Sequence, residues 1–384
     1  MDFGFSEEQL AIQAAARRFS VDRLAPGYAS RDKASALDRG LMREMGSLGL
    51  IAPELDESAG GQSASYVTTG LIIEAVAASD FNMAYVSLLA SLNGQILAEH
   101  ASPELKIEWL TRACSGEALL ALALTEPRGG SDAGSLELGM VRDGEHYVLN
   151  GEKTSISCAD QADAAVVFAR SGTREQGAAG VSAILVPLSL PGISRTHFDD
   201  IGERSVGRGS IFFDNVRVPQ AYLLGSEGSG FTQVMQGFDY SRALIGLQCL
   251  GLATACLEET WAYARERQAF GKPLTAFQGV SHRLAELDTQ VSAARLLCYQ
   301  TLWLKDQDLP HTAEAAMCKW WAPRLAFDTV HACLLVHGHA GYSRELPFEQ
   351  RLRDVLGLQI GDGTAEIMKT VIARQRVGRK AVPM

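Results

Sequence analysis

Apolar residues in the first third of the chain recur at helical spacing. From Ser6 to Phe19 they stand three or four positions apart, and Ser6 with Gln9 matches a capping box at a helix start. Pro26 then interrupts the run. Further helices are predicted over residues 38–48, 65–78, 83–100 and 103–115. The pattern predicts a helical N-terminal domain over residues 1–117.

From residue 118 the pattern changes to short apolar runs of strand length. They lie at residues 118–124, 147–149, 165–168, 181–186 and 210–213. The pairs Asp143-Gly144, Asn150-Gly151 and Pro191-Gly192 between them are typical of turns. We expect a middle β domain, a barrel or a sandwich, over residues 118–230.

Long periodic helices return after the glycine-rich joint at residues 225–230. They are predicted over residues 231–268, 276–306, 312–339 and 364–378, with a shorter helix before Gly357. Consecutive long helices with short connections pack side by side, so residues 231–384 are expected to form a four-helix bundle. Because helices and strands are segregated along the chain, the fold class is α+β, and a doubly wound sheet is disfavoured.

Composition and charge narrow the possible functions. The chain has 384 residues, 47% of them hydrophobic and 21% charged, which is ordinary for a globular protein with a large core. The formal net charge of −10 disfavours general binding to nucleic acid or to an anionic membrane surface. An anionic ligand would therefore be bound by local groups.

Cysteine usage and the N-terminus both favour the cytoplasm. The seven cysteines are an odd number without CxxC spacing, as expected of free thiols in a reducing compartment. The acidic start, residues 1–8, does not match a signal or transit peptide. The longest uncharged runs, 81–98 and 176–194, are interrupted by polar residues or proline, so no membrane insertion is expected.

A Rossmann-type dinucleotide site is not predicted. The glycine-rich stretch at residues 225–230 has the wrong spacing for GxGxxG and does not follow a strand. Nicotinamide dependence is therefore disfavoured. The pair His337 and His339 has no further metal ligands nearby in the sequence, and no metal site is predicted.

The loop at residues 359–364 carries the strongest chemical signal. Asp362 stands between Gly361 and Gly363, just before a predicted helix. The glycines allow a close approach of the backbone, so this carboxylate can act as a base while its own N–H points at the same substrate. The alternative is a turn residue that caps the helix beginning near Thr364.

Three segments stand in the order in which one flavoprotein family carries them: residues 124–132 (LTEPRGGSD), residues 267–271 (RQAFG) and the Asp362 loop. Over nearly its whole length the chain resembles the acyl-CoA dehydrogenases. The resemblance implies an FAD-dependent enzyme that holds FAD between the β domain and the bundle. It also implies an acyl-CoA or acyl-carrier-protein substrate and an electron acceptor such as an electron-transfer flavoprotein.

The resemblance assigns site residues position by position. Asp362 would remove the α-proton of the thioester while the β-hydride passes to flavin N5, and its N–H would polarise the thioester oxygen. The implied cofactor-binding residues are Leu124, Thr125, Ser131, Ser155, Ser157, Arg267, Phe270, Gln278, Gly338, Thr364 and Glu366. The implied substrate-binding residues are Ser131, Phe238, Asp239, Arg242, Gly361 and Gly363. For Arg242 the alternative is an ordinary helical ion pair with Asp239.

The segment around Arg267 reaches the FAD of a neighbouring subunit in this family. The resemblance therefore implies a homo-oligomer, a tetramer or at least a dimer, in which Arg267 grips the cofactor diphosphate.

Several positions depart from the family pattern. Asp362 stands where most members have glutamate, and its reach is shorter by roughly one C–C bond. Ser155 replaces a tryptophan that shields the flavin, which predicts easier access for oxygen or an acceptor. Leu335 and His339 also differ from the usual residues. With Gly361 in place of a bulky aromatic, we expect a branched, cyclic or carrier-bound acyl group.

Two other functions are compatible with the sequence. Nitroalkane oxidases, which are relatives, also use aspartate at this position, so a flavin oxidase of that type is one alternative. The other is a catalytically silent relative that binds CoA esters. Oxygen consumption without a CoA ester would favour the first, and a colourless purified protein would favour the second.

Overall fold

The computed structural model describes residues 4–382, so the first three residues of the acidic N-terminus lie outside the described part. The N-terminal region is helical, as expected. Ser6 accepts from the Gln9 N–H at 3.1 Å and donates its own N–H to Gln9 Oε1 at 3.0 Å, which confirms the capping box. The helices are α1 (Glu7–Phe19), α2 (Tyr28–Ala34), α3 (Arg39–Ser47), α4 (Tyr66–Ala77), α5 (Phe81–His100), α6 (Pro103–Leu105) and α7 (Thr111–Cys114).

The helix predicted over residues 103–115 is not regular. A π-helical segment, Lys106–Leu110, separates α6 from α7. A π turn holds one more residue than an α turn, so it shifts the face that the following residues present. Trp109 and Leu110, consecutive in sequence, are both buried here. The spacing of apolar residues in the sequence does not reveal the extra residue of this π turn.

The middle region is one mixed, eight-stranded sheet in the order β6-β7-β3-β2-β4-β5-β8, with β1 paired in parallel to β4. Its strands are β1 (Leu120–Ala123), β2 (Gly139–Asp143), β3 (His146–Ser157), β4 (Ala164–Arg170), β5 (Val181–Pro187), β6 (Ile193–Arg195), β7 (Arg208–Pro219) and β8 (Leu223–Leu224). Strands β4 and β5 are buried almost throughout, which explains their continuous apolar sequences.

The turn predicted at Asn150-Gly151 is wrong. Strand β3 passes through both residues, and its pairing with β7 shifts register between Leu149 and Gly151. Gly151 has a φ of 138°, so the pair marks an irregularity within a strand. The turn at Asp143-Gly144 joins β2 to β3 as predicted.

The C-terminal region consists of long helices with a small hairpin between the first two. The elements are α8 (Gly230–Glu266), β9 (Gln268–Ala269), β10 (Lys272–Pro273), α9 (Gln278–Asp306), α10 (Thr312–His337), α11 (His339–Tyr342), α12 (Phe348–Gly357) and α13 (Ala365–Val377). Within the described residues, α8 is long and apolar enough to cross a membrane, but 89% of its most apolar window is buried in the fold. It serves as the central helix of the bundle.

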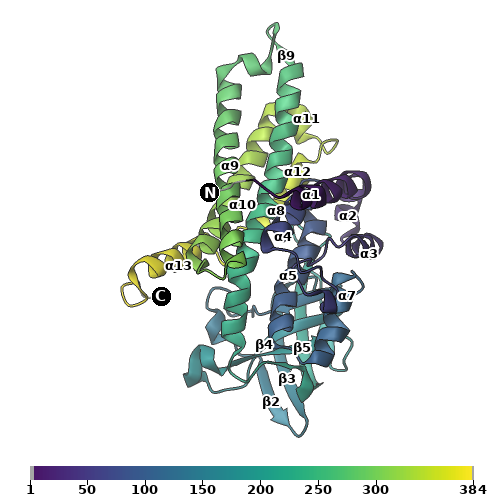
Figure 1. Cartoon of the computed structure of the whole chain (residues 1–384), viewed down its shortest axis with the longest axis vertical. Coiled ribbons are helices and arrows are strands. Elements are labelled where there is room, and N and C mark those ends of the chain that lie inside the picture. The colour runs from purple at the N-terminus through teal and green to yellow at the C-terminus, as the bar shows by residue number, and fades with distance from the viewer. Residues whose placement is uncertain (1–3, 383–384) are drawn as a thin grey trace.

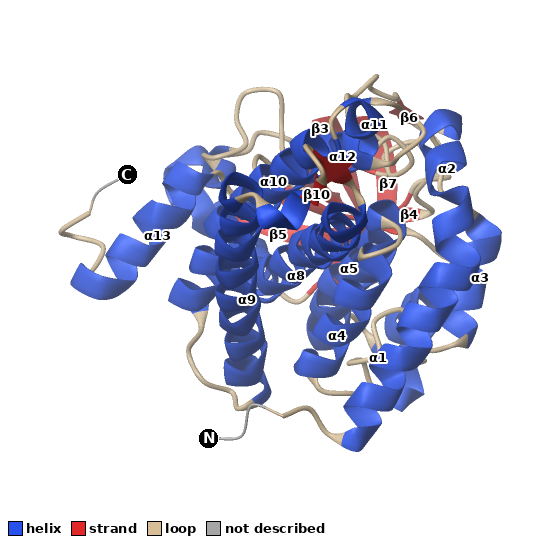
Figure 2. Ribbon diagram, turned by 90° about the horizontal axis from the view of Figure 1, so that it is seen from above, coloured by secondary structure: helices blue, strands red, loops and turns tan. Residues whose placement is uncertain are grey.

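The β domain lies at one end of the molecule and the β9–β10 hairpin at the other (Figure 1). Seen from above, α8, α9 and α10 are packed together, α4 and α5 lie beside α8, and α13 extends to one side (Figure 2). Helix α5 contacts both α8 and β1, so it bridges the bundle and the sheet.

A buried carboxylate joins three parts of the chain. Asp354, on α12, accepts from Tyr28 Oη at 2.6 Å, from Asn82 Nδ2 at 3.0 Å and from the Glu203 N–H at 2.6 Å. These donors come from α2, from α5 and from the loop before β7. Burial raises the pKa of Asp354 to about 7. Its full set of hydrogen bonds fixes how the N-terminal helices and the β domain meet the bundle.

Candidate functional site

The loop between α12 and α13 holds Asp362 in an uncommon backbone conformation. Asp362 has a φ of 54° and Gly363 a φ of 108°. A Cβ at Gly363 would lie 2.5 Å from Met368 Cε, whereas one at Gly361 would meet nothing within 4 Å. The positive φ of Gly363 therefore favours glycine, since the Met368 side chain could move aside, while a side chain at Gly361 would meet open space.

The cap of α13 is formed by the residue next to this turn. Thr364 is the N-cap residue, and its hydroxyl accepts from the Ile367 N–H. The side chain of Asp362 makes no hydrogen bond with any residue that the structure describes, so the alternative of a capping aspartate does not apply. The N–H of Asp362 likewise has no acceptor among residues 4–382. Both polar groups of this residue are free to meet a ligand.

Two buried cations hold the loop through its carbonyl groups. Arg242 Nε donates to Asp362 O at 3.4 Å, and its Nη1 lies 3.0 Å from Asp239 Oδ1. Lys319 Nζ donates to the carbonyls of Leu358 and Gly363, at 2.6 and 3.2 Å. The ion pair of Arg242 with Asp239 is present, but Arg242 is buried and reaches the base loop as well.

Burial and charge act in opposite directions on Asp362. Desolvation raises the pKa of its carboxyl, and the positive charges of Lys319, Arg242 and Arg208 oppose this rise. The carboxylate in turn helps to raise the pKa of Tyr85, whose main cause is burial. A carboxyl group in this setting is a stronger base than an exposed aspartate.

The Asp362 carboxyl group is linked electrostatically to residues beside two strands of the β domain. Ser157, at the end of β3, is paired with Arg208 at the start of β7. Tyr85 Oη lies 3.3 Å from Ser157 Oγ, and the pKa of Tyr85 responds to Asp362. Arg208 forms an ion pair with buried Glu203. The serine predicted to face the flavin therefore lies on the same side of the fold as the predicted base.

The segment that follows β1 runs beside β3. The Thr154 N–H donates to Thr125 O at 2.9 Å, and Lys153 Nζ donates to Leu124 O at 2.9 Å. Lys153 is fully buried and pairs with Glu126 at 2.7 Å. Ser131 and Ser155 are exposed, and Ser155 has a φ of 54°. These contacts place Leu124 and Thr125 beside the second half of β3, the strand that ends at Ser157.

A second group of predicted residues lies far from this edge in the same chain. Arg267, Phe270 and Gln278 belong to the β9–β10 hairpin and its flanks, at the opposite end of the molecule from the sheet (Figure 1). Phe270 is 95% exposed, and Arg267 makes no side-chain contact with another described residue through a hydrogen bond or an ion pair. His337 stacks on Tyr263 near the end of α8, so Gly338 lies close to this group.

Phe238 and Asp239 complete the bundle side of the site. Phe238 is buried and its ring lies 5.5 Å from the Arg242 guanidinium, while Asp239 Oδ2 accepts from Thr312 Oγ1 at 2.6 Å. Glu366 is exposed on the first turn of α13. One chain therefore brings together Asp362, Gly361, Gly363, Arg242 and Asp239, but not the hairpin residues.

Sequence reasoning missed Lys319, Arg208 and Tyr85. Lys319 gave one usable signal, because it is the one charged residue in the apolar helical run 315–323, and such a lysine must be paired or solvated. Arg208 and Tyr85 gave none, because their role depends on the packing of β7 and α5 around the loop.

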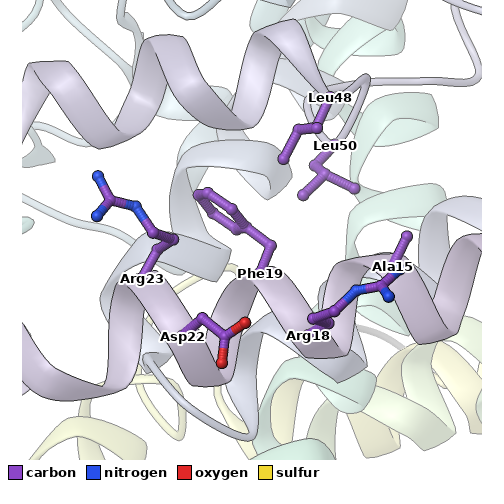
Figure 3. A pocket seen from close by; sticks show the side chains of 7 residues that line it. All are labelled: Ala15, Arg18, Phe19, Asp22, Arg23, Leu48 and Leu50. Carbon is purple, nitrogen blue, oxygen red and sulfur yellow. The ribbon is translucent and has the colours of Figure 1, made fainter.

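A surface depression of about 300 Å³ lies elsewhere, between α1 and the segment that follows α3 (Figure 3). It contains none of the predicted site residues. It is lined by Ala15, Arg18, Phe19, Asp22, Arg23, Leu48 and Leu50.

Comparison with known families assigns nearly the whole chain. Residues 6–117, 121–216 and 228–376 match the N-terminal, middle and C-terminal domains of acyl-CoA dehydrogenase. The chain belongs to the acyl-CoA dehydrogenase family. It is 34% identical over 378 residues to the probable acyl-CoA dehydrogenase YngJ of Bacillus subtilis, covering 98% of this chain and 99% of that protein.

Solved structures agree with this assignment. The butyryl-CoA dehydrogenase of Megasphaera elsdenii superposes with a TM-score of 0.94 at 30% identity, covering 98% of this acyl-CoA dehydrogenase and all of that chain. The structure described as PigA with FAD and proline has a TM-score of 0.95 at 27% identity, covering 99% and 100% of the two chains. The α+β fold, the FAD-dependent oxidoreductase class and FAD as the family cofactor are confirmed.

Proposed function

We propose that this acyl-CoA dehydrogenase removes the α-proton of an acyl-CoA thioester with Asp362 and catalyses α,β-dehydrogenation. The observation that supports this most directly is the placement of Asp362. Its carboxyl group is desolvated, is held in a left-handed turn and makes no hydrogen bond with residues 4–382. Its charge acts on Tyr85, whose hydroxyl lies 3.3 Å from Ser157 Oγ at the end of β3. A catalytic base needs these properties, whereas a structural aspartate would be hydrogen bonded.

The residues present fit FAD. Thr125 is hydrogen bonded to Thr154 of β3, and Ser155 and Ser157 follow on that strand, so their hydroxyl and backbone groups suit the polar rim of an isoalloxazine. Arg267, whose side chain has no hydrogen-bond or ion-pair partner in the described part of its own chain, suits a diphosphate. When bound, FAD supplies the acceptor for the β-hydride. Thr364 and Glu366 at the start of α13 would hold its phosphates or adenosine, beside a helix N-terminus that favours anions.

The loop residues position and polarise the thioester. The free N–H of Asp362 would donate to the thioester oxygen, which stabilises negative charge as the α-proton leaves. The carboxylate would take that proton from the adjacent carbon, with Phe238, Asp239 and Arg242 forming the neighbouring wall. Raising the pKa of Asp362 brings it closer to that of the acidified α-proton and so favours the transfer.

The open space at Gly361 supports a wide acyl group. A Cβ at this position would meet nothing within 4 Å, so the loop leaves room beside the base. A branched, cyclic or carrier-bound acyl group fits this arrangement better than a straight chain. We further propose a cytoplasmic enzyme that passes its electrons to an acceptor such as an electron-transfer flavoprotein.

The test is to mix the FAD-loaded enzyme anaerobically with a panel of straight, branched and cyclic acyl-CoA thioesters. Reduction of the bound flavin is measured as the loss of its absorption band. Bleaching by at least one thioester is expected. Bleaching by nitroalkanes alone, with rapid oxygen consumption, would replace this function by that of an oxidase. No bleaching by any compound would contradict both.

The raised pKa of Asp362 predicts the acid side of the pH profile. The base must be ionised, so the rate of flavin reduction should fall as pH decreases through the pKa of Asp362. That midpoint is expected above 3.8, the ordinary value for aspartate, because desolvation outweighs the surrounding cations. Stopped-flow reduction across pH measures it, and a rate unchanged down to pH 4 would contradict the prediction.

We expect each FAD site to be completed by a partner subunit. Arg267→Ala should weaken FAD binding by about tenfold or more, because a bidentate contact to the diphosphate is lost. Asp362→Asn subunits mixed and refolded with Arg267→Ala subunits should regain activity, since one site then combines the intact Asp362 of one chain with the intact Arg267 of the other. Persistent inactivity of mixtures that do form heteromers would place both residues in the same chain's site.

A further inference from the structure

Lys319 is a buried cation that forms no direct ion pair with a carboxylate of the described residues. Its side chain is 1% exposed on α10, and its ammonium forms no ion pair within 4.0 Å among the described residues. Within residues 4–382 its ammonium makes two hydrogen bonds, to Leu358 O at 2.6 Å and to Gly363 O at 3.2 Å. An ammonium group is costly to bury, so its presence here calls for a specific role.

The two acceptors are the two ends of one loop. Leu358 follows the last turn of α12, and Gly363 precedes the N-cap of α13, so a single ammonium ties together the points where the loop leaves and rejoins the helices. Arg242 holds Asp362 O between them. With three of the loop's carbonyls held by cations, Asp362 stays in a left-handed conformation that costs of order 1 kcal/mol in a free chain.

Resting on the proposed function, we propose that Lys319 is a positioning residue for Asp362, fixing the loop that carries the base and supplying a positive charge beside it. Lys319 does not touch the substrate. It acts by limiting the positions of the carboxyl group, and a displacement near 1 Å can cost about 10²-fold in rate. The short side chain of aspartate gives the loop little freedom to compensate.

Several charged groups surround this pair. The charges of Lys319 on α10, Arg242 on α8 and Arg208 on β7 lower the pKa of Asp362. The charge of Asp362 in turn raises the pKa of Tyr85 and of Glu203. Cys249 also faces Lys319 and raises the pKa of its ammonium group. Burial lowers the pKa of Lys319 to about 8, and its positive charge lowers that of Asp362. Losing the charge should therefore raise the pKa of Asp362.

Three substitutions separate the two contributions. Lys319→Met removes both the hydrogen bonds and the charge, Lys319→Gln keeps a donor without the charge, and Lys319→Arg keeps both kinds of interaction. Thr329→Val, a buried change on the same helix whose hydroxyl has no partner among residues 4–382, is the matched control.

In FAD-loaded protein we expect Lys319→Met to lower the limiting rate of flavin reduction at pH 7 by about tenfold or more. Thioester affinity should change by less than about threefold. The acid limb of the pH profile should move upward in Lys319→Met and Lys319→Gln, and Lys319→Arg should restore it. A purely structural lysine would not move this limb.

Hydrogen exchange tests the loop independently of catalysis. Amides of residues 358–364 should exchange faster in Lys319→Met than in the wild type or Thr329→Val, with Lys319→Gln between them. Unchanged exchange together with an unchanged acid limb would overturn the proposal. If no thioester reduces the wild-type flavin, the proposed function fails, and the exchange result still decides whether Lys319 holds the loop.

Discussion

Asp362→Asn is expected to lower the rate of flavin reduction by acyl-CoA by about 10³-fold or more, while FAD and thioester affinity stay within about threefold. The amide has nearly the same shape, and it leaves the Asp362 N–H and the contacts of Arg242 and Lys319 in place. It cannot accept the α-proton, and removing a general base typically costs 10² to 10⁴ in rate. Anaerobic stopped-flow reduction and thioester titration measure the two effects.

Asp308 offers a matched control for this variant. It is an exposed aspartate with a φ of 52°, so Asp308→Asn makes the same chemical change in the same backbone conformation, away from the loop. That variant should react normally. Near-normal reduction by Asp362→Asn would remove Asp362 from its proposed role.

Asp362→Glu tests whether the length of the side chain at this position matters. If the loop is advanced to suit the shorter residue, glutamate will extend too far and its rate will fall. If instead the loop is not advanced and a wide substrate makes up for the shorter side chain, Asp362→Glu should accept straight-chain thioesters better than the wild type does.

The largest expected loss of stability follows from Asp354→Ala, which should lower the free energy of unfolding by about 3–5 kcal/mol. The substitution leaves Tyr28 Oη, Asn82 Nδ2 and the Glu203 N–H without their acceptor in a buried place. Each unsatisfied donor carries a desolvation cost, and the three come from separate parts of the fold. Thermal unfolding at fixed protein and FAD concentration measures the loss.

Two control variants show whether the loss of stability is specific to the three hydrogen bonds of Asp354. Tyr28→Phe removes one of the three donors and should cost only about 1 kcal/mol. Asp328→Ala removes an aspartate on α10 whose partner is an exposed arginine one turn away, and should cost less than about 0.5 kcal/mol. A loss for Asp354→Ala no larger than that of Asp328→Ala would contradict a joining role for Asp354.

The predicted long helices agree closely with the structure because their apolar spacing reports directly on burial. The start of α8 was predicted one residue late, and the end of α9 at Asp306 was predicted correctly. Local deviations were not foreseen. The shift in β3 at Gly151 and the π turn at Lys106–Leu110 both depend on packing partners distant in sequence.

The candidate site shows the same division. Asp362, Gly363 and Arg242 were found from the sequence because they lie in recognisable segments, and the structure brings them together. Lys319 and Tyr85 lie in helices whose neighbouring residues are ordinary core residues. Their relation to Asp362 arises from how α10 and α5 pack against the loop, which helical spacing does not encode.

Helix α8 runs without interruption from Arg242, beside the base loop, to the hairpin that begins after Glu266. Arg267 follows Arg242 by 25 positions, which span roughly 37 Å at the rise of an α-helix. Inserting or deleting one residue in this rod would turn its two ends by about 100° relative to each other. The number of residues in this helix is therefore constrained at both ends, and changes in chain length should be confined to the loops.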